Sequence, residues 1–405
     1  MRESVRIALV LAAAAMLVAG VQAQERLGSA GPAPSYAPGW TFTPMFGVAE
    51  TYDDNVSLSG TGSADSLNDD RIATYFPGAD LNYNGRHTNT NAEYTGSFLQ
   101  YSTFSALNRW DQHGKVDVRR DETARLKWMA HANYTALPTT DVVDLGGIPF
   151  SRRGAQTATF RGGVTYEFTP RDAISSSADY QRVSFDRPEE LRAFLRGGRV
   201  FEVANGWRHK IDSRTALGAD YSFRRAAITG DIETFNLHSV QAAVDYEIDP
   251  LWSLSAAGGV VYLQSTPTTL ASTGPAWRIA LGHHRNSRTF TVHYVRSYIP
   301  SFGFGGTIQN QEAGVSYHTP LFNDRRWYFD NSATFRNDTP LTEGFQQLPL
   351  RSFRFYSTIG WVPQPWVRIE GFYARTQQTS LRPGGQVYRD RIGVQVVTSK
   401  PMRMQ

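Results

Sequence analysis

The chain has 405 residues, with 41 Lys and Arg against 37 Asp and Glu, and its formal charge of +4 is too small and too dispersed to indicate a nucleic-acid surface. A composition of 40% hydrophobic and 13% aromatic residues predicts a folded protein, and the absence of Cys excludes a disulfide framework, a thiolate metal site and Cys-based catalysis. No apolar run approaches the length of about 20 residues that a membrane-spanning helix needs, which excludes a polytopic helical membrane protein.

The first segment predicts export. Arg2 and Arg6 form a charged start, an apolar run follows that is too short to span a bilayer, and residues 21–23 have the small-x-Ala pattern of a cleavage site. Residues 1–23 are therefore predicted to be a Sec-type signal peptide. Residues 24–40 contain three Pro and little that packs, so they predict a flexible N-terminal leader that is too short to form a plug domain.

From residue 41 onward the hydrophobic pattern has a period of two. Apolar and aromatic residues alternate with polar ones in four clear runs, which are residues 157–168, 215–224, 252–262 and 367–374. Runs of about 10 to 13 residues are longer than the ~5–6 residues of an average soluble strand. Their length matches that of tilted strands that cross an outer membrane.

The segments between the runs are of two alternating kinds. Short turns rich in Pro and charge fall at residues 120–123, 169–172, 248–250, 285–287 and 363–365. Longer polar stretches fall at residues 53–70, 136–155, 186–197, 265–274 and 337–349. Aromatic residues beside the short turns fit the girdle at the periplasmic membrane interface, namely Phe168, Trp207, Tyr246, Trp252, Tyr317, Trp327, Trp361 and Trp366.

The pattern predicts an all-β fold, a transmembrane antiparallel up-and-down barrel of about 18 strands over residues 41–398, followed by a short tail at 399–405. The expected strands begin at residues 42, 71, 89, 114, 124, 156, 173, 198, 214, 235, 252, 275, 288, 309, 326, 350, 366 and 387. Two segments fit less well: 115–120 is short, and in 235–248 Phe235 and Leu237 are out of phase with the later apolar residues.

A resemblance follows from the start of the barrel. Residues 46–56 form a strand that leads into Asp53-Asp54-Asn55 and an apolar residue, and this stretch resembles the first strand of the outer-membrane barrels called β-barrel porin type 2. The resemblance implies an outer-membrane barrel of undefined cargo, in a family often found with exopolysaccharide secretion systems. It supplies no catalytic residues. The last strand also resembles the signal read by the barrel assembly machinery, although the chain lacks a terminal Phe.

Strand parity predicts which charged side chains line the lumen. The basic candidates are Lys115, Arg119, Arg161, Arg224, Arg278, Arg336, Arg354, Arg368 and Arg391. The acidic candidates are Asp117, Glu167, Asp179, Glu202, Asp220, Asp245, Glu312, Asp330 and Glu370. Because the two sets nearly cancel, they either create a transverse field across a water-filled pore or pair across neighbouring strands to keep the wall rigid.

One external loop carries a possible constriction. Residues 186–196 fit one or two helical turns, and the loop contains Arg187, Arg192 and Arg196. Folded inward, these Arg residues would narrow the pore and meet anionic solutes. In the alternative, they lie at the surface and contact lipopolysaccharide phosphates.

An enzymatic function is not expected. Ser316 and His318 share a lumen-facing parity, but no Asn or Asp partner is evident from their spacing. His283 and His284 point to opposite faces of a strand and so cannot chelate one metal ion. We expect no metal and no cofactor.

The sequence therefore predicts a channel in the outer membrane of a Gram-negative bacterium. It would pass small hydrophilic solutes or export an exopolysaccharide, in which case Tyr356 and Phe372 have the parity to stack on sugar rings. The alternative is a non-conducting scaffold or binding barrel of a polysaccharide secretion complex. The expected partners are outer-membrane lipid, lipopolysaccharide, the barrel assembly machinery and polysaccharide secretion components, with no nucleic acid.

Overall fold

The computed structural model describes residues 38–58, 69–138, 154–186, 197–228, 233–266, 271–300, 302, 307–322, 324–341, 349–380 and 385–404. The predicted signal peptide lies outside these residues. In the described part the only helix is the 3₁₀ turn η1 (Ser105–Leu107). None of the described helical segments has the length and hydropathy needed to cross a membrane.

Eighteen long strands and one short strand make up the fold. They are β1 (Gly39–Asp53), β2 (Asp70–Asn84), β3 (Thr88–Tyr101), β4 (Arg109–Asp121), β5 (Leu126–Pro138), β6 (Gly154–Glu167), β7 (Asp172–Phe185), β8 (Gly198–Lys210), β9 (Thr215–Ile228), β10 (Glu233–Glu247), β11 (Trp252–Thr266), β12 (Ala271–Arg285), β13 (Arg288–Pro300), β14 (Thr307–Leu321), β15 (Asp324–Pro340), β16 (Leu350–Gln364), β17 (Val367–Ser380), β18 (Gln386–Ser399) and β19 (Met402–Arg403).

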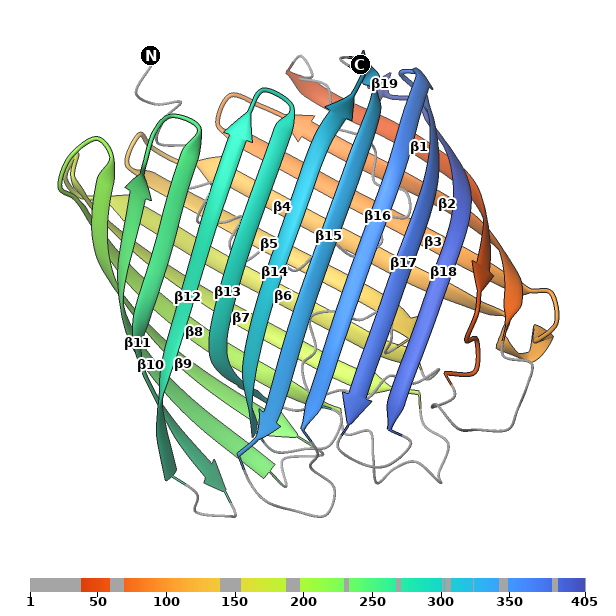
Figure 1. Cartoon of the computed structure of the whole chain (residues 1–405). Coiled ribbons are helices and arrows are strands. Elements are labelled where there is room, and N and C mark those ends of the chain that lie inside the picture. The colour runs from red at the N-terminus through yellow and green to blue at the C-terminus, as the bar shows by residue number, and fades with distance from the viewer. Residues whose placement is uncertain are drawn as a thin grey trace.

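The sheet closes on itself. Each long strand pairs antiparallel with its sequence neighbours, and β1 also pairs with β18 from Met45↔Ser399 to Asp53↔Arg391 (Figure 1). The predicted all-β, up-and-down barrel of about 18 strands is confirmed. Closure pairs the backbone polar groups of most of the described wall within the sheet; the exception is the external ends of β12 and β13, which separate beyond Trp277↔Arg296.

The predicted limits of the barrel differ from those of the structure at both ends. Gly39 and Trp40, assigned from the sequence to the leader, already belong to β1. The predicted tail also contains sheet, because Met402 and Arg403 form β19 and pair with Phe42 and Thr41. Two residues are too few to show a period, which is why the alternation gave no sign of β19.

The start of β4 was predicted five residues too late, and the strand is not short. Its outward positions include Gln112 and Gly114, so they lack the apolar alternation used to find strands. Its inward positions include Arg109 and Asp111, whose side chains form an ion pair with 3.0 Å between Nε and Oδ1. These inward residues are charged like the other residues that line the lumen.

The start of β12 was predicted four residues too late, because Gly274 and Pro275 signal a loop. The pairing of β12 with β13 ends at Trp277↔Arg296, so the first residues of β12 have a neighbour on one side only. A proline is tolerated on such an edge, where its missing N–H costs no ladder hydrogen bond.

The two kinds of connection lie at opposite ends of the barrel. Short turns, such as those at residues 122–125, 248–251 and 286–287, share one end with β19 and the C-terminus, at the top of Figure 1. The strands that flank the longer connections predicted at 53–70, 136–155 and 186–197 reach these connections at the other end. We call the first end the periplasmic end and the second the external end, following the placement of short turns and long loops in outer-membrane barrels.

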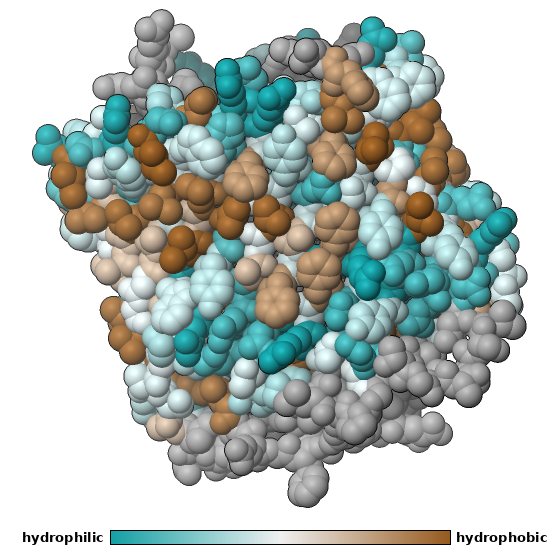
Figure 2. Space-filling view, viewed as in Figure 1, coloured by the Kyte–Doolittle hydropathy of each residue, from teal (hydrophilic) through white to brown (hydrophobic). Residues whose placement is uncertain are grey.

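The outer wall is apolar. On β1, Phe46 and Val48 are exposed while Met45 and Ala49, which face the other way, are buried. Figure 2 shows apolar side chains interspersed with polar ones across one side of this wall. At the periplasmic end Trp327 and Trp361 stack with ring centroids 5.5 Å apart. Exposed rings next to the short turns fit the predicted aromatic girdle.

A pH-dependent stabilisation is expected at the turn between β8 and β9. The backbone N–H groups of Arg214 and Thr215 each donate to Asp212 Oδ1 over 2.7 Å, and these bonds lower the pKa of Asp212 below its ordinary value. A lowered carboxyl pKa stabilises the fold above the unfolded-state pKa, and this stabilisation is lost as the pH falls through the folded value.

We therefore expect Asp212→Ala to lower the midpoint of urea unfolding at neutral pH, and the difference from wild type to shrink at strongly acidic pH. Asp212→Asn keeps an acceptor but not the charge, so its deficit should change little with pH. If Asp212→Ala lowers the urea midpoint by the same amount at all pH values, the charge of the Asp212 carboxylate does not contribute to stability.

Candidate functional site

The inner face of the barrel carries the predicted lining residues. Arg224 Nη1 on β9 donates to the backbone oxygen of Tyr298 on β13 over 3.3 Å, and these non-adjacent strands can meet only through the lumen. Side chains alternate between the two faces along each strand, and directly paired residues on neighbouring strands share a face. The strand register therefore identifies the inward residues of every strand. The predicted residues that share it are Arg119, Arg161, Arg224, Arg278, Arg336, Arg354, Arg368, Glu167, Asp179, Asp220, Asp245, Glu312, Asp330 and Glu370. Contact with a solute stays a prediction for each of them.

One row of polar side chains stands in direct register on eight consecutive strands. From β2 to β9 its members are Asn82, Asn91, Asp117, His131, Arg161, Asp179, Glu202 and Arg224. His131 Nδ1 lies 2.7 Å from Asp117 Oδ1, Arg161 pairs with Asp179, and Arg224 Nε donates to Glu202 over 2.8 Å. Because strands in a barrel are tilted, the row crosses the inner wall obliquely. Most of its charge is compensated within the row.

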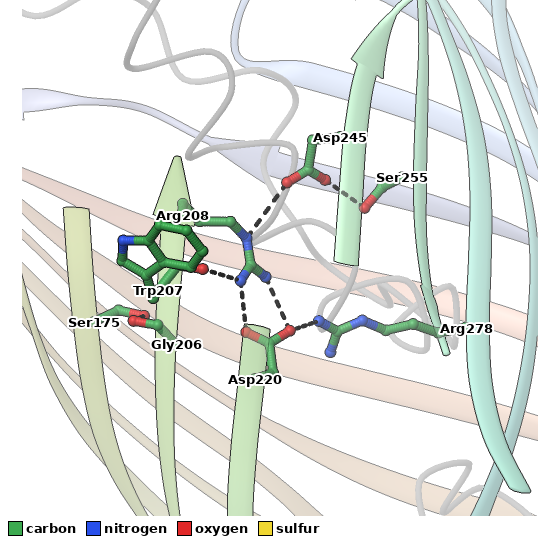
Figure 3. Close-up of polar contacts among 8 residues, drawn as sticks. All are labelled: Ser175, Gly206, Trp207, Arg208, Asp220, Asp245, Ser255 and Arg278. Atoms are coloured by element: carbon green, nitrogen blue, oxygen red, sulfur yellow. Dashed lines mark hydrogen bonds and ion pairs between the residues drawn. The ribbon is translucent and has the colours of Figure 1, made fainter. Parts of the chain in front are cut away.

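A second charged group centres on Arg208 of β8 (Figure 3). Its guanidinium donates to both carboxylate oxygens of Asp220, over 2.6 and 2.9 Å, and its Nε lies 3.5 Å from Asp245. Arg278 Nη2 donates to Asp220 over 2.7 Å, and Ser255 Oγ donates to Asp245 over 2.6 Å. Two arginines thus share two carboxylates on strands β8 to β12.

Small inward residues make room for this group. Gly218, Ala243, Ala257 and Arg278 follow one another in register from β9 to β12. A Cβ on Gly218 would lie 2.5 Å from Arg208 Nη1, so the arginine runs directly over this glycine. The long side chains therefore lie along the wall instead of projecting across the lumen.

A third group surrounds Glu370 on β17. Tyr328 Oη and Gln395 Nε2 each donate to this carboxylate, and Arg368 Nε lies 3.2 Å from it. Tyr328 belongs to β15 and reaches across β16 because Gly360 lies beneath its ring, where a Cβ would be 2.1 Å from Cζ. The bonded side chains of this network come from three strands, β15, β17 and β18, near the periplasmic end.

Gly360→Ala is expected to displace the Tyr328 ring and to break its hydrogen bond to Glu370. Overpacking and the loss of a bond to a buried charge together predict a loss of about 1–3 kcal/mol in unfolding free energy. The measurement is urea unfolding in lipid vesicles, followed by tryptophan fluorescence. Gly371→Ala on β17 is the matched control, because a Cβ there meets nothing within 4 Å; an equal loss in both variants would contradict this explanation.

The two predicted sugar-stacking residues lie in a hollow of about 70 Å³ between β1–β5 and β16–β18. Their rings stack on each other with centroids 6.1 Å apart. Phe372 is only 8% exposed and its ring also lies over Gly393, where a Cβ would be 2.7 Å from Cζ. Phe372 therefore offers a solute little surface, and Tyr356 is the more accessible ring of the pair.

An ion pair at the closure of the barrel borders the same hollow. Arg389 of β18 donates to Asp53 of β1 from Nε over 2.9 Å and from Nη2 over 2.6 Å. Asp53 is 0% exposed and Arg389 2% exposed. The pair fastens the first strand to the last at the external end.

Apolar side chains fill part of the external half of the lumen. We call this cluster the apolar collar; its members are Ala155, Val183, Phe185, Val200, Ala226, Ile228, Phe235, Leu237, Val261, Leu263, Ala276, Tyr298 and Phe302. Most members are inward residues of β6–β12. Tyr298 and Phe302 come from the external end of β13 and the residues after it, where the chain has left β12.

The external end of β13 and Phe302 lie close to β8 and β9. Phe302 is 2% exposed, and its Cε1 lies 3.2 Å from the position of a Cβ on Gly198 of β8. The out-of-phase Phe235 and Leu237 were the one sequence signal of the apolar collar, since they place large apolar groups on the inner face. The predicted constriction residues Arg187, Arg192 and Arg196 lie outside the described residues, and their role stays a prediction.

Several residues of the lining were not singled out from the sequence. Arg208, His131, Tyr328, Gln395 and Arg389 all have inward parity, but their importance depends on partners on other strands. Parity shows which face a side chain occupies, but not which neighbour its far end reaches.

His318 has an acidic partner that spacing alone did not reveal. Its Nδ1 lies 2.6 Å from Asp330 Oδ1 on β15, the strand paired with β14. Ser316 is the next inward residue on β14. Among the described residues, no group of three or more His, Asp or Glu is arranged to hold a metal ion.

No family model matches the sequence, and no curated protein matches it either. The chain is similar in structure to OccAB4 of Acinetobacter baumannii, with a TM-score of 0.47, 10% identity and coverage of 91% of this chain and 100% of that one. It is similar to OpdQ of Pseudomonas aeruginosa, with a TM-score of 0.45, 9% identity and coverage of 90% and 98%. For the outer membrane protein opdK of Pseudomonas aeruginosa the TM-score is 0.45, the identity 10% and the coverage 89% and 99%.

Proposed function

We propose that this chain forms a water-filled channel in the outer membrane of a Gram-negative bacterium and passes small hydrophilic solutes. The observation that carries the proposal is the contrast between the two faces of a closed barrel, with exposed apolar side chains outside and linked charges inside. An apolar exterior suits lipid, whereas a wall of hydrogen-bonded charges is stable only where water or polar partners solvate it. Export by a Sec signal and insertion by the barrel assembly machinery belong to the proposal.

The charge pattern supports a weakly selective pore. Arg161, Arg208 and Arg224 each pair with a carboxylate on a neighbouring strand, so little net charge faces the solute. A lining without excess charge excludes neither anions nor cations strongly. The apolar collar makes one side of the external lumen dry and directs polar solutes along the other side, where the hollow near Tyr356 lies.

One observation favours a second candidate, the export of an exopolysaccharide. Tyr356 lines the same hollow as three arginines, Arg109, Arg389 and Arg391, and an aromatic ring beside basic groups suits acidic sugars. The small remaining surface of Phe372 weakens this case. A non-conducting scaffold is the third candidate, and the volume filled by the apolar collar is the observation in its favour.

Single-channel recording of the refolded protein in a planar bilayer tests the proposal. We expect discrete conductance steps and a small reversal potential under a salt gradient. Block by an added acidic polysaccharide, but not by a neutral one, would favour export. The heat-dependent mobility of the protein on a gel shows whether the barrel is folded. Absence of conductance from a folded barrel would overturn the channel proposal and favour the scaffold.

The substitution Arg208→Ala tests whether the measured current passes through the lumen beside this residue. Loss of this guanidinium leaves Asp245 and part of Asp220 uncompensated, so the pore should become more cation-selective and its reversal potential should shift accordingly. The matched control is Arg375→Ala, which removes a partly exposed outward arginine paired with Asp390. Equal reversal potentials for both variants and wild type would show that the current does not pass Arg208.

A further inference from the structure

Three short turns at the periplasmic end, those between β4 and β5, β6 and β7, and β8 and β9, share one geometry. In each turn a side-chain oxygen accepts the backbone N–H of an arginine two positions further on. These bonds join Arg125 to Thr123 Oγ1, Arg171 to Thr169 Oγ1 and Arg214 to Asp212 Oδ1, over 3.2, 3.1 and 2.7 Å. The residue after each arginine donates to the same oxygen. All three arginine side chains are exposed, so one turn structure presents them in the same position.

The three arginines are evenly spaced along the rim of the barrel. Each of these turns follows the previous one by two strands. Neighbouring strands lie about 4.8 Å apart and are tilted by roughly 35–45° in a barrel, which places successive turns about 12 Å apart along the rim. A small solute reaches one of these arginines at a time, whereas an extended polymer contacts all three.

The periplasmic end as a whole is basic. Its short turns, the strand ends beside them and the C-terminal residues contain fourteen Lys and Arg and eight Asp and Glu, a formal charge of +6 against +4 for the whole chain. The residues counted are 84–88, 119–127, 167–172, 209–215, 247–252, 283–289, 319–327, 362–367 and 399–404. Every acidic residue of these segments is included in this balance, so the rest of the chain is net negative.

The surplus of positive charge lies at the rim and not along the path through the barrel. Within the lumen, Arg161, Arg208 and Arg224 pair with carboxylates on neighbouring strands. A solute that enters the lumen leaves most of the positive charge of the rim behind. The location of the surplus therefore favours a partner that stays at the periplasmic end.

We propose that the periplasmic rim binds the carboxylates of peptidoglycan, the polymer that lies beneath an outer membrane. Guanidinium forks match carboxylates in geometry and charge. A polymer whose acidic groups recur along its length suits arginines that recur along the rim. This surface rests on the proposed placement of the barrel in an outer membrane. It does not rest on conduction, so a non-conducting barrel would bind peptidoglycan equally well.

Cosedimentation of the whole refolded barrel, in neutral detergent, with purified peptidoglycan sacculi tests this surface. We expect the triple variant Arg125→Gln/Arg171→Gln/Arg214→Gln to bind at least about tenfold more weakly than wild type at low salt, and the difference to shrink as salt screens the charges. Gln keeps the backbone N–H groups that form the turns, so the variant retains the fold, which its heat-dependent gel mobility verifies. A triple variant that binds as tightly as wild type overturns the proposal.

A fourth turn allows a gain of binding to be tested. Between β10 and β11, Asp249 Oδ1 accepts the N–H groups of Leu251 and Trp252 over 2.7 and 2.9 Å, so Leu251 occupies the position that arginine has in the other three turns. Leu251→Arg should therefore bind sacculi at least about threefold more tightly than wild type. Binding no tighter than that of wild type contradicts the role of this position.

Two controls identify the location of the charge and the ligand group. Arg182→Gln/Arg225→Gln/Arg375→Gln removes the same charge from the outer faces of β7, β9 and β17 and should bind as wild type; a loss equal to that of the turn variant overturns the proposal. Sacculi with amidated carboxyl groups should bind wild type as weakly as untreated sacculi bind the turn variant. Equal binding of both kinds of sacculi, or binding to phosphatidylglycerol vesicles but not to sacculi, also overturns it.

Discussion

Arg389→Ala is expected to lower the unfolding free energy of the barrel by about 3–5 kcal/mol, because it leaves a buried carboxylate without its charged partner. Asp53 is 0% exposed and receives both the Nε and Nη2 bonds of Arg389. The loss should appear as a lower urea midpoint in lipid vesicles and a lower temperature of heat-modifiability.

The double variant Asp53→Ala/Arg389→Ala separates pairing from packing. Removing both charges should cost less than removing Arg389 alone, because no unpaired charge is left behind. Arg375→Ala is the surface control, since its 3.6 Å pair with Asp390 is partly exposed on the outer face and should contribute less than about 1 kcal/mol. A double variant as unstable as Arg389→Ala would show that the cavity, and not the charge, sets the loss.

Tyr298→Ala/Phe302→Ala is expected to raise the single-channel conductance by about twofold, because these rings belong to the apolar collar that narrows the external lumen. The two side chains come from the one described segment that crosses from β13 toward β8 and β9. Their removal widens the lumen without changing its charge. Ion selectivity should therefore stay as in wild type while the current rises.

Phe335→Ala is the matched control, because it removes an exposed ring from the outer face of β15. Its conductance should equal that of wild type. An unchanged conductance in the collar variant would place the narrowest point elsewhere, and a closed channel would mean that the collar supports the pore rather than obstructing it.

The strands could be predicted from the sequence because their signal is local. Alternation in residues 157–168 reveals both that β6 is a strand and that Arg161 and Glu167 share its inner face. The alternation of side chains between the two faces is sufficient for this assignment. A shift of the strand register by one residue would place every apolar side chain of the strand in the lumen.

The partners of these side chains could not be predicted, because they depend on contacts across several strands. Arg278 reaches Asp220 three strands away along a path of small residues, and Tyr328 reaches Glu370 only because Gly360 lies between them. The separation of β13 from β12 also depends on contacts far apart in sequence. Tyr298 and Phe302 belong to a buried cluster whose other members come from the seven strands β6 to β12. Such contacts emerge only when the sheet is closed.

The pairing of β1 with β18 and β19 also determines the order of events during folding. Every other pairing joins neighbours in sequence, whereas Asp53 and Arg389 are 336 positions apart. Closing so long a loop is slow and entropically costly until the intervening hairpins have formed. The barrel therefore assembles as a growing, curved sheet with two open edges, and it becomes a closed wall only after the last residues of the chain arrive.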